Sequence, residues 1–211
     1  MSICILDYGM ANLRSVQKAF EHVGASAHII SKPEQIDRAE KFVLPGVGAF
    51  QDAIRTLRDN GLVEPILRHI EKGKPFLGIC LGLQMLFDVG YEDGKHKGLG
   101  VIGGKCIRFD VDQTMDLKVP HMGWNQLMIQ KRSPLMKDLA GNSSVYFVHG
   151  YHVVPEGADR EIIATTTDYG RPFVSSIWRD NVMATQFHPE KSQQVGLKML
   201  ANFAALSPAI R

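Results

Sequence analysis

The sequence is poor in cysteine and in net charge. Its 211 residues include three cysteines, Cys4, Cys80 and Cys106, an odd number at wide spacing with no Cys-x-x-Cys pair. This usage argues against a disulfide framework and favours a reducing compartment, so we expect a cytoplasmic protein. Lysine and arginine number 24 against 22 acidic residues. That balance of well-mixed signs argues against a nucleic acid or a membrane surface as partner.

Long apolar runs are also missing. The longest, residues 76–87, is interrupted by glycine and glutamine, whereas a spanning helix needs about 20 apolar residues. The N-terminus begins directly in a strand-like run and lacks the basic region of a signal peptide.

His149 and His152 would point to opposite faces of a strand and make a poor metal pair. We therefore expect neither a metal nor a cofactor.

The order of apolar patterns predicts an α/β fold. Expected strands are 2–6, 27–30, 42–44, 75–79, 101–109, 126–130, 145–154, 162–167, 174–178 and 182–187. Expected helices are 13–23, 50–58, 62–71, 81–87 and 193–206. Continuous apolar strands separated by amphipathic helices indicate a parallel sheet covered on both faces. We predict a single three-layer domain over residues 1–206, with a central mostly parallel sheet flanked by helices, partly antiparallel later strands and a short tail at 207–211.

The segment around Cys80 carries the most chemical information. A buried strand runs into this cysteine, a helical period follows it directly, and Gly78 and Gly82 stand two residues away on either side. This pattern predicts a nucleophile elbow with cysteine as the nucleophile, where the N-terminus of the helix favours the thiolate. The N–H of Leu81 would be free to stabilise an oxyanion. Gln84 would lie one turn further along the same face.

A cysteine nucleophile needs a base, and His188 is the best candidate. It ends an apolar strand, so its side chain can project from the sheet edge into a cleft. Pro189 stops the strand ladder from continuing. Glu190, two residues further on, is close enough to orient the imidazole.

Each of these assignments has a structural alternative. A free cysteine is more often a small buried apolar residue, and Cys4 and Cys106 keep that interpretation. A histidine beside an acid at a strand end can be an ordinary surface pair. Four histidines in helical or polar contexts are expected to be solvated: His22, His28, His69 and His96.

Two glycine-rich stretches look like phosphate-binding motifs but fail on context. Residues 98–103 match G-x-G-x-x-G, yet they follow a polar loop and lead into a strand rather than a helix. Residues 45–48, Pro-Gly-Val-Gly, lack the Gly-Lys-Ser/Thr of a phosphate loop. They instead end a strand and can offer the backbone N–H groups of Val47 and Gly48 opposite Leu81.

Together these segments resemble the class-I, triad-type glutamine amidotransferases. The resemblance rests on residues 78–84, Gly-Ile-Cys-Leu-Gly-Leu-Gln, and on residues 188–190, His-Pro-Glu, in the family's order of Cys followed by His-x-Glu. A closer resemblance, to glutaminase subunits of imidazole glycerol phosphate synthase, rests on residues 7–13, 45–50, 120–125 and 147–151. Two positions depart from many members: Ala11 replaces a glycine, and Gly150 replaces a hydroxyl residue at a possible glutamine contact.

The resemblance implies that the protein hydrolyses glutamine to glutamate and ammonia. Cys80 would attack the side-chain amide carbon and form a thioester. His188, oriented by Glu190, would protonate the departing ammonia and then activate water. The family also implies oxyanion donors at Leu81 and at Val47 or Gly48, and glutamine contacts at Gly48 and Gln84.

A partner is also implied, because 211 residues leave no room for an acceptor-substrate domain. By resemblance it is a (β/α)₈-barrel cyclase that forms a heterodimer with this chain in histidine biosynthesis. It would produce imidazole glycerol phosphate and an aminoimidazole carboxamide ribonucleotide. Four residues match positions near the family's interface: Asn12, Trp124, Tyr146 and Lys191. Their structural alternatives are, in that order, a helix cap, a core aromatic, a strand residue and a solvated lysine.

Three other functions remain open from the sequence. The same glutaminase chemistry could serve a different synthase, for example in surface-polysaccharide synthesis. A stand-alone cysteine hydrolase would be active without a partner and would accept peptides or esters. A non-catalytic binding subunit is disfavoured because Cys80, His188 and Glu190 are all present.

Overall fold

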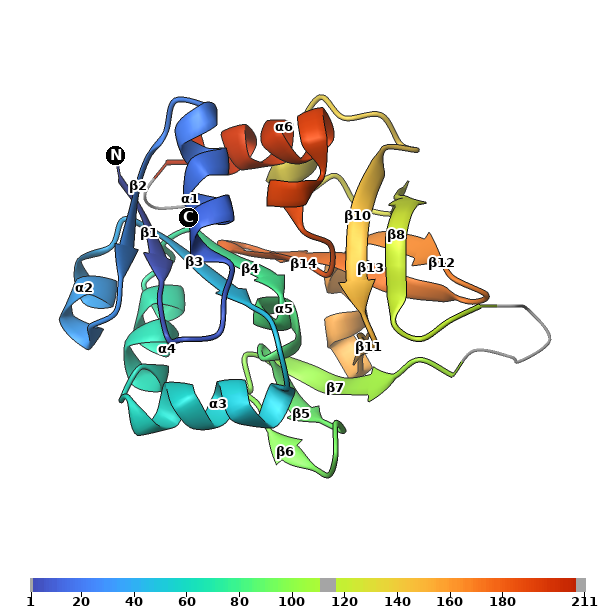
Figure 1. Cartoon of the computed structure of the whole chain (residues 1–211), viewed down its shortest axis with the longest axis horizontal. Coiled ribbons are helices and arrows are strands. Elements are labelled where there is room, and N and C mark those ends of the chain that lie inside the picture. The colour runs from blue at the N-terminus through green and yellow to red at the C-terminus, as the bar shows by residue number, and fades with distance from the viewer. Residues whose placement is uncertain (1, 111–116, 208–211) are drawn as a thin grey trace.

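A central sheet of eight strands organises the chain (Figure 1). The computed structural model describes residues 2–110 and 117–207. The strand order is β2 (Ser26–Ile30), β1 (Ser2–Leu6), β3 (Lys41–Gly46), β4 (Phe76–Cys80), β14 (Val182–Thr185), β13 (Pro172–Arg179), β12 (Ile163–Asp168) and β9 (Met128–Ile129). The first five strands are parallel and the pairs from β14 to β9 are antiparallel. The predicted mostly parallel sheet with antiparallel later strands is confirmed.

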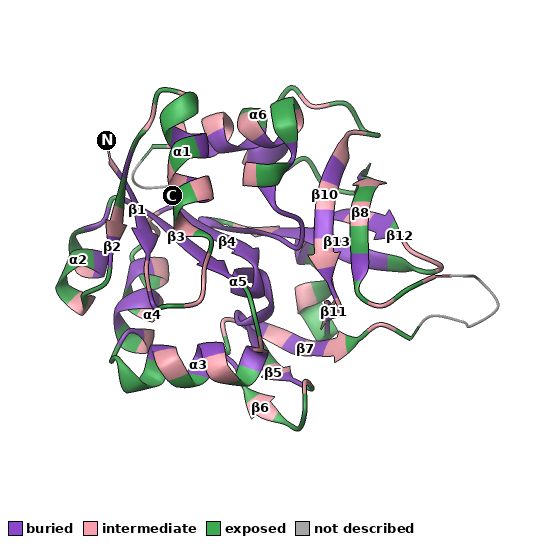
Figure 2. Cartoon of the chain, viewed as in Figure 1, coloured by how far each residue is buried: buried purple, intermediate pink, exposed green. Residues whose placement is uncertain are grey.

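Helices cover both faces of this sheet. One face carries α1 (Leu13–His22) and α6 (Gln193–Ala204), and the other carries α2 (Pro33–Arg38), α3 (Phe50–Asp59) and α4 (Val63–Glu71). Successive side chains of a strand point to opposite faces. In β1, Ile3 and Ile5 therefore pack in the cluster of α1 and α6, whereas Cys4 and Leu6 pack in the other cluster. Figure 2 shows the resulting buried central layer.

Two smaller sheets extend the second half of the chain. β8 (His121–Gln126) pairs with β10 (Ser144–His149), and a four-stranded sheet has the order β11 (Tyr151–Pro155), β7 (Ile102–Arg108), β5 (Phe87–Gly90) and β6 (His96–Lys97). The predicted strand 145–154 is therefore wrong as one element, because the chain breaks at Gly150 and its halves join different sheets. The predicted strand 126–130 is also wrong. Only Met128–Ile129 form β9, and Gln126 ends β8.

Two helix predictions also need correction. The helix α5 spans only Leu81–Gln84, not 81–87. The carbonyls of Met85 and Leu86 accept hydrogen bonds from Leu99, Val101 and Ile102, so the chain turns into β5 instead of continuing the helix. The six-residue α2 was not predicted because it spans fewer than two turns. The short 3₁₀ turns η2 (Pro134–Met136), η3 (Gly157–Ile162) and η4 (Pro189–Lys191) complete the described elements.

Within residues 2–110 and 117–207, no helix is long and apolar enough to cross a membrane. In the same part of the chain, no group of three or more His, Cys, Asp or Glu side chains is placed to hold a metal ion.

Candidate active site

Cys80 stands on a sharp turn between β4 and α5, as the elbow pattern predicts. Its backbone has φ 55° and ψ −106°, a conformation that costs free energy for a residue with a side chain. The flanking glycines are required by close backbone approach. A Cβ on Gly82 would lie 1.9 Å from the Leu44 carbonyl oxygen, and a Cβ on Gly78 would lie 2.9 Å from the Gly82 carbonyl. The start of α5 therefore rests directly on backbone, which holds the cysteine sulfur at the end of the sheet.

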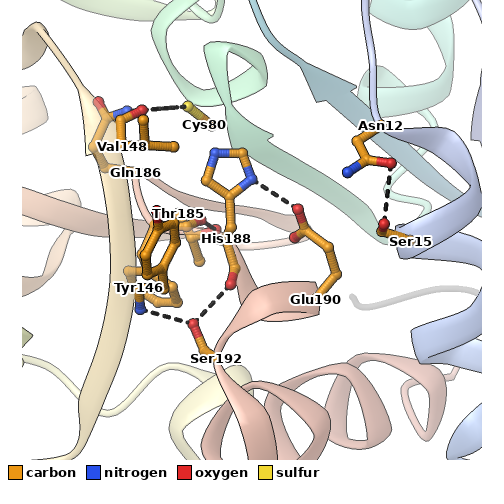
Figure 3. A network of polar contacts seen from close by, with 11 residues as sticks. Asn12, Ser15, Cys80, Tyr146, Val148, Thr185, Gln186, His188, Glu190 and Ser192 are labelled. Carbon is orange, nitrogen blue, oxygen red and sulfur yellow. Dashed lines mark hydrogen bonds and ion pairs between the residues drawn. The ribbon is translucent and has the colours of Figure 1, made fainter. Parts of the chain in front are cut away.

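Sheet topology brings His188 to this cysteine. β14 is the immediate neighbour of β4, with Thr185 opposite Ile79, so the residues that follow the two strands meet at one sheet end. Figure 3 shows the imidazole of His188 between Cys80 and the carboxylate of Glu190. The His188 Nδ1 lies 2.7 Å from Glu190 Oε1, and the two side chains are 3% and 1% exposed. This burial removes the alternative of an ordinary surface pair.

Backbone and hydroxyl contacts fix His188 in this position. Its N–H donates to the carbonyl of Tyr146 in β10 at 3.0 Å. The hydroxyl of Ser192 donates to the His188 carbonyl at 2.7 Å and accepts from the Tyr146 N–H at 3.0 Å (Figure 3). The short sheet β8–β10 is thus tied directly to the histidine. Ser192 was not singled out from the sequence, because a serine after a strand carries no pattern of its own.

The electrostatics of this group favour a protonated imidazole. Burial alone would lower the pKa of His188. The negative charge of Cys80, together with the negative charge of Glu190 and its hydrogen bond to the imidazole, outweighs this effect and raises the pKa to about 10. An opposite charge within a few ångströms stabilises the charged form most strongly where water is excluded. The imidazole of His188 is therefore expected to carry a proton at neutral pH.

A cavity of about 420 Å³ opens onto Cys80 and His188. Its wall contains the predicted oxyanion and substrate residues Leu81, Val47, Gly48 and Gln84. The remaining lining residues are Glu92, Pro120, Val148, His149, Gly150, Tyr151 and Lys191. The volume is within the usual range for a pocket that takes a small molecule.

The loop Val47–Gly48 reaches the cavity but does not present both N–H groups. The Val47 N–H donates to the Met10 carbonyl at 2.8 Å, so it would have to leave this bond before it could serve an oxyanion. Gly48 has φ 97°, a region that favours glycine. Leu81, in contrast, occupies the first position of α5, where a backbone N–H has no partner within its own helix.

Comparison with known proteins agrees with this geometry. The family model for class-I glutamine amidotransferases matches residues 4–206. This chain belongs to the class-I glutamine amidotransferase family. It is 59% identical over 204 residues to the imidazole glycerol phosphate synthase subunit HisH of Syntrophotalea carbinolica, covering 95% of this chain and 98% of the relative. The HisH subunit of Aquifex aeolicus is 53% identical, with 96% of each chain covered.

Solved structures support the amidotransferase fold. PurLQS from Thermotoga maritima matches with a TM-score of 0.73 at 17% identity over 96% of each chain. A crystal structure of a glutamine amidotransferase matches with a TM-score of 0.72 at 17% identity, covering 97% of this chain and 99% of that one. The resemblance inferred from the sequence is confirmed at the level of family and fold.

Three of the four expected interface residues of this amidotransferase lie together. Trp124 is 49% exposed, which removes the alternative of a core aromatic. Its ring meets that of Tyr146 at a centroid distance of 6.1 Å, and the Lys191 Nζ lies 5.9 Å from the centre of the Tyr146 ring. Asn12 stands at the start of α1, but its side chain makes no cap hydrogen bond and instead accepts from the Ser15 hydroxyl at 3.0 Å.

One cavity residue of chemical interest was missed from the sequence. Glu92 lies in a polar turn after β5, where nothing distinguishes it from a solvated acid. Its Oε2 accepts a 2.7 Å hydrogen bond from the N–H of Phe50, the first residue of α3, and its side chain lines the cavity wall. A carboxylate at a helix N-terminus interacts favourably with the helix dipole, which adds to the hydrogen bond that holds Glu92 beside the cavity.

Proposed function

We propose that this amidotransferase hydrolyses glutamine through a Cys80 thioester and supplies the ammonia to the cyclase of imidazole glycerol phosphate synthase. The observation that carries the proposal is the 59% identity, over nearly the whole chain, to a relative named as the HisH subunit of that synthase. The relatives' common name gives no support to a different synthase or to a stand-alone hydrolase.

In the first step, the Cys80 thiolate attacks the side-chain amide carbon of glutamine. Negative charge then develops on the amide oxygen, and the N–H of Leu81 stabilises it. Removing one such donor typically costs about 10²–10³-fold in turnover. The second donor to the oxyanion is a backbone N–H of the Val47–Gly48 loop. The Val47 N–H can take part only after its hydrogen bond to the Met10 carbonyl is broken.

Proton transfer follows from the charges around His188. As the sulfur forms a covalent bond to carbon, it loses its charge, and one of the contributions that raise the pKa of His188 disappears. The effect of burial is then less strongly opposed, so the pKa of His188 falls. The imidazolium therefore becomes a better acid at the moment when the departing ammonia needs a proton. The neutral imidazole that remains, held by Glu190, can activate water to hydrolyse the thioester.

The cavity offers charges that match a free amino acid. Glu92 suits the ammonium group of glutamine, and Lys191 suits its carboxylate. Gln84 and Gly48 complete the contacts at this end of the substrate. This division places the amide of glutamine at Cys80 and its charged end at Glu92 and Lys191.

Ammonia must stay unprotonated to act as a nucleophile, so transfer inside a complex is favoured over release into water. The cyclase partner would be a (β/α)₈ barrel that docks on the surface formed by Trp124, Tyr146 and Lys191, with Asn12 nearby. It would form imidazole glycerol phosphate and the aminoimidazole carboxamide ribonucleotide. The three unpaired cysteines suit a reducing cytoplasm.

The test is glutamate production from glutamine by the complex with its cyclase. Cys80→Ala should abolish glutamine turnover yet leave synthesis from added ammonium salts intact. Cys4→Ala, which changes another buried free cysteine, is the matched control and should keep glutamine turnover. Normal glutamine cleavage by Cys80→Ala would refute the mechanism.

A further inference from the structure

Gln186 is a buried polar residue that touches the nucleophile and has no role in the mechanism above. Its side chain is fully buried, and its Nε2 lies 3.7 Å from the Cys80 sulfur, within hydrogen-bond range for sulfur. Its backbone N–H donates to the Ser175 carbonyl at 2.8 Å, which fixes the residue just beyond β14. A buried amide beside a reacting atom calls for a functional explanation.

The direction of the Gln186 amide is set by neighbours that cannot reverse. The Tyr151 backbone carbonyl accepts only, so the group of Gln84 that lies 3.2 Å from it must be the Nε2 donor. The second hydrogen of that Nε2 points to Gln186 Oε1 at 3.1 Å. With its oxygen committed to Gln84, Gln186 has to present its Nε2 hydrogens to the sulfur. If the Gln84 amide were flipped, its oxygen would face the Tyr151 carbonyl, so two acceptors would meet. If the Gln186 amide were flipped, its NH₂ group would face that of Gln84, so two donors would meet.

Besides the imidazole of His188, two uncharged groups lie near the sulfur, and they favour opposite charge states. The Val148 carbonyl lies 4.0 Å from the sulfur and can accept a hydrogen bond from the neutral thiol, but it would repel a thiolate. The Gln186 N–H can only donate, so it favours the thiolate. Figure 3 shows Val148 and Gln186 beside Cys80, on the side away from Glu190.

We propose that Gln186 stabilises the Cys80 thiolate by donating an Nε2 hydrogen, in an orientation enforced through Gln84 by the Tyr151 carbonyl. This rests on the proposed function, since it takes Cys80 as the nucleophile. The same hydrogen bonds determine which atom of Gln84 can bind the substrate. Both Nε2 hydrogens of Gln84 are used inside the protein, so its oxygen is the atom left to accept from glutamine.

Two substitutions separate the donor from its surroundings. Gln186→Glu keeps the shape and the acceptor for Gln84 but loses the donor and adds negative charge. Gln186→Met is close in length and loses both polar groups. Thr165→Val is the matched control, because it deletes a fully buried hydroxyl bonded to Ser175 and Ser176 at 2.8 and 2.7 Å that does not touch the sulfur.

The readouts are iodoacetamide alkylation of Cys80 as a function of pH and glutamine hydrolysis in the complex with the cyclase. A hydrogen bond to a charged group contributes about tenfold or more to an equilibrium. Gln186→Met should therefore move the alkylation midpoint upward by about one pH unit and lower kcat about tenfold with little change in KM. Gln186→Glu should exceed both effects, and Thr165→Val should change neither. Unchanged midpoints in both Gln186 variants would overturn the proposal.

Failure of the proposed function is a separate result. If Cys80→Ala still hydrolyses glutamine, the nucleophile is wrong, whereas inactive Cys80→Ala with unchanged Gln186 variants refutes only the role of Gln186. Should neither Gln186 variant fold, the wild-type chain still gives an answer. The side-chain amide resonance of Gln186, assigned through its own backbone, should shift with pH in step with alkylation. A pH-independent resonance would refute the proposal.

Discussion

Gly82→Ala tests the claim that the elbow rests on backbone contact. In an open helical position this substitution is favourable by about 1 kcal/mol, because alanine is the better helix former. At Gly82 the added Cβ would lie 1.9 Å from the Leu44 oxygen and 3.1 Å from its carbonyl carbon. Overpacking costs about 1–3 kcal/mol where side chains can yield. The obstacle here is the backbone of β3, so we expect a loss of about 3 kcal/mol.

A loss of that size has a clear signature in thermal unfolding. For a chain of this length, about 1 kcal/mol corresponds to 2–4 °C in Tm, so Tm should fall by about 6–12 °C. Glutamine turnover should fall with it, because β3 and α5 must separate and the Leu81 N–H moves. Gly141→Ala is the control, since no atom lies within 4 Å of its added Cβ. Equal stability of the two variants, or a more stable Gly82→Ala, would refute the reasoning.

Three further predictions concern the triad and the exposed surface. Glu190→Gln removes a charge that helps raise the pKa of His188 to about 10; the basic limb of the kcat/KM profile should move to lower pH and turnover should fall by about 10²–10⁴-fold. Cys80→Ala removes the other negative neighbour, so the NMR titration of His188 should move to lower pH, and an unchanged midpoint would contradict the coupling. Trp124→Ala should leave Tm unchanged but weaken binding to the cyclase about tenfold or more by calorimetry; full affinity would exclude Trp124 from the interface.

The sequence predicted the first half of the fold well, because its strands are buried on both faces. Such strands are continuous apolar runs that contrast with amphipathic helices. The predicted ranges 2–6 and 50–58 differ from β1 and α3 by at most one residue. The elbow was predictable for the same reason, since an apolar strand, two glycines and a helical period are local signals.

The later strands were harder because their partners are distant in the sequence. In β8, His121–Gln126, only His121 is buried; the later positions alternate between exposed and half-buried, and Met122 and Trp124 are exposed. Its residues are partly polar, and only pairing with β10 makes a strand of them. The Val47 N–H is a similar case, because its bond to the Met10 carbonyl joins two loops that no periodic pattern relates.

His69 shows how burial overrides residue type. It was expected to be solvated, yet it is 1% exposed, its Nε2 lies 3.1 Å from the Pro75 carbonyl, and its ring packs against Phe42. Burial lowers its pKa to about 4, so it is neutral at physiological pH. Its place three residues after Ile66, on the apolar face of α4, was the available signal.

Because β14 pairs with β4, the site around Cys80 can form only late in the synthesis of the chain. The ribosome adds Cys80 more than a hundred residues before it adds His188. Until residues 182–185 are synthesised, β4 is an open edge of the sheet, which other chains could pair with. Synthesis of this segment therefore brings the proposed catalytic residues together and covers the open edge of β4 at the same late stage. The proposed mechanism predicts no glutamine turnover from a chain that stops before that point.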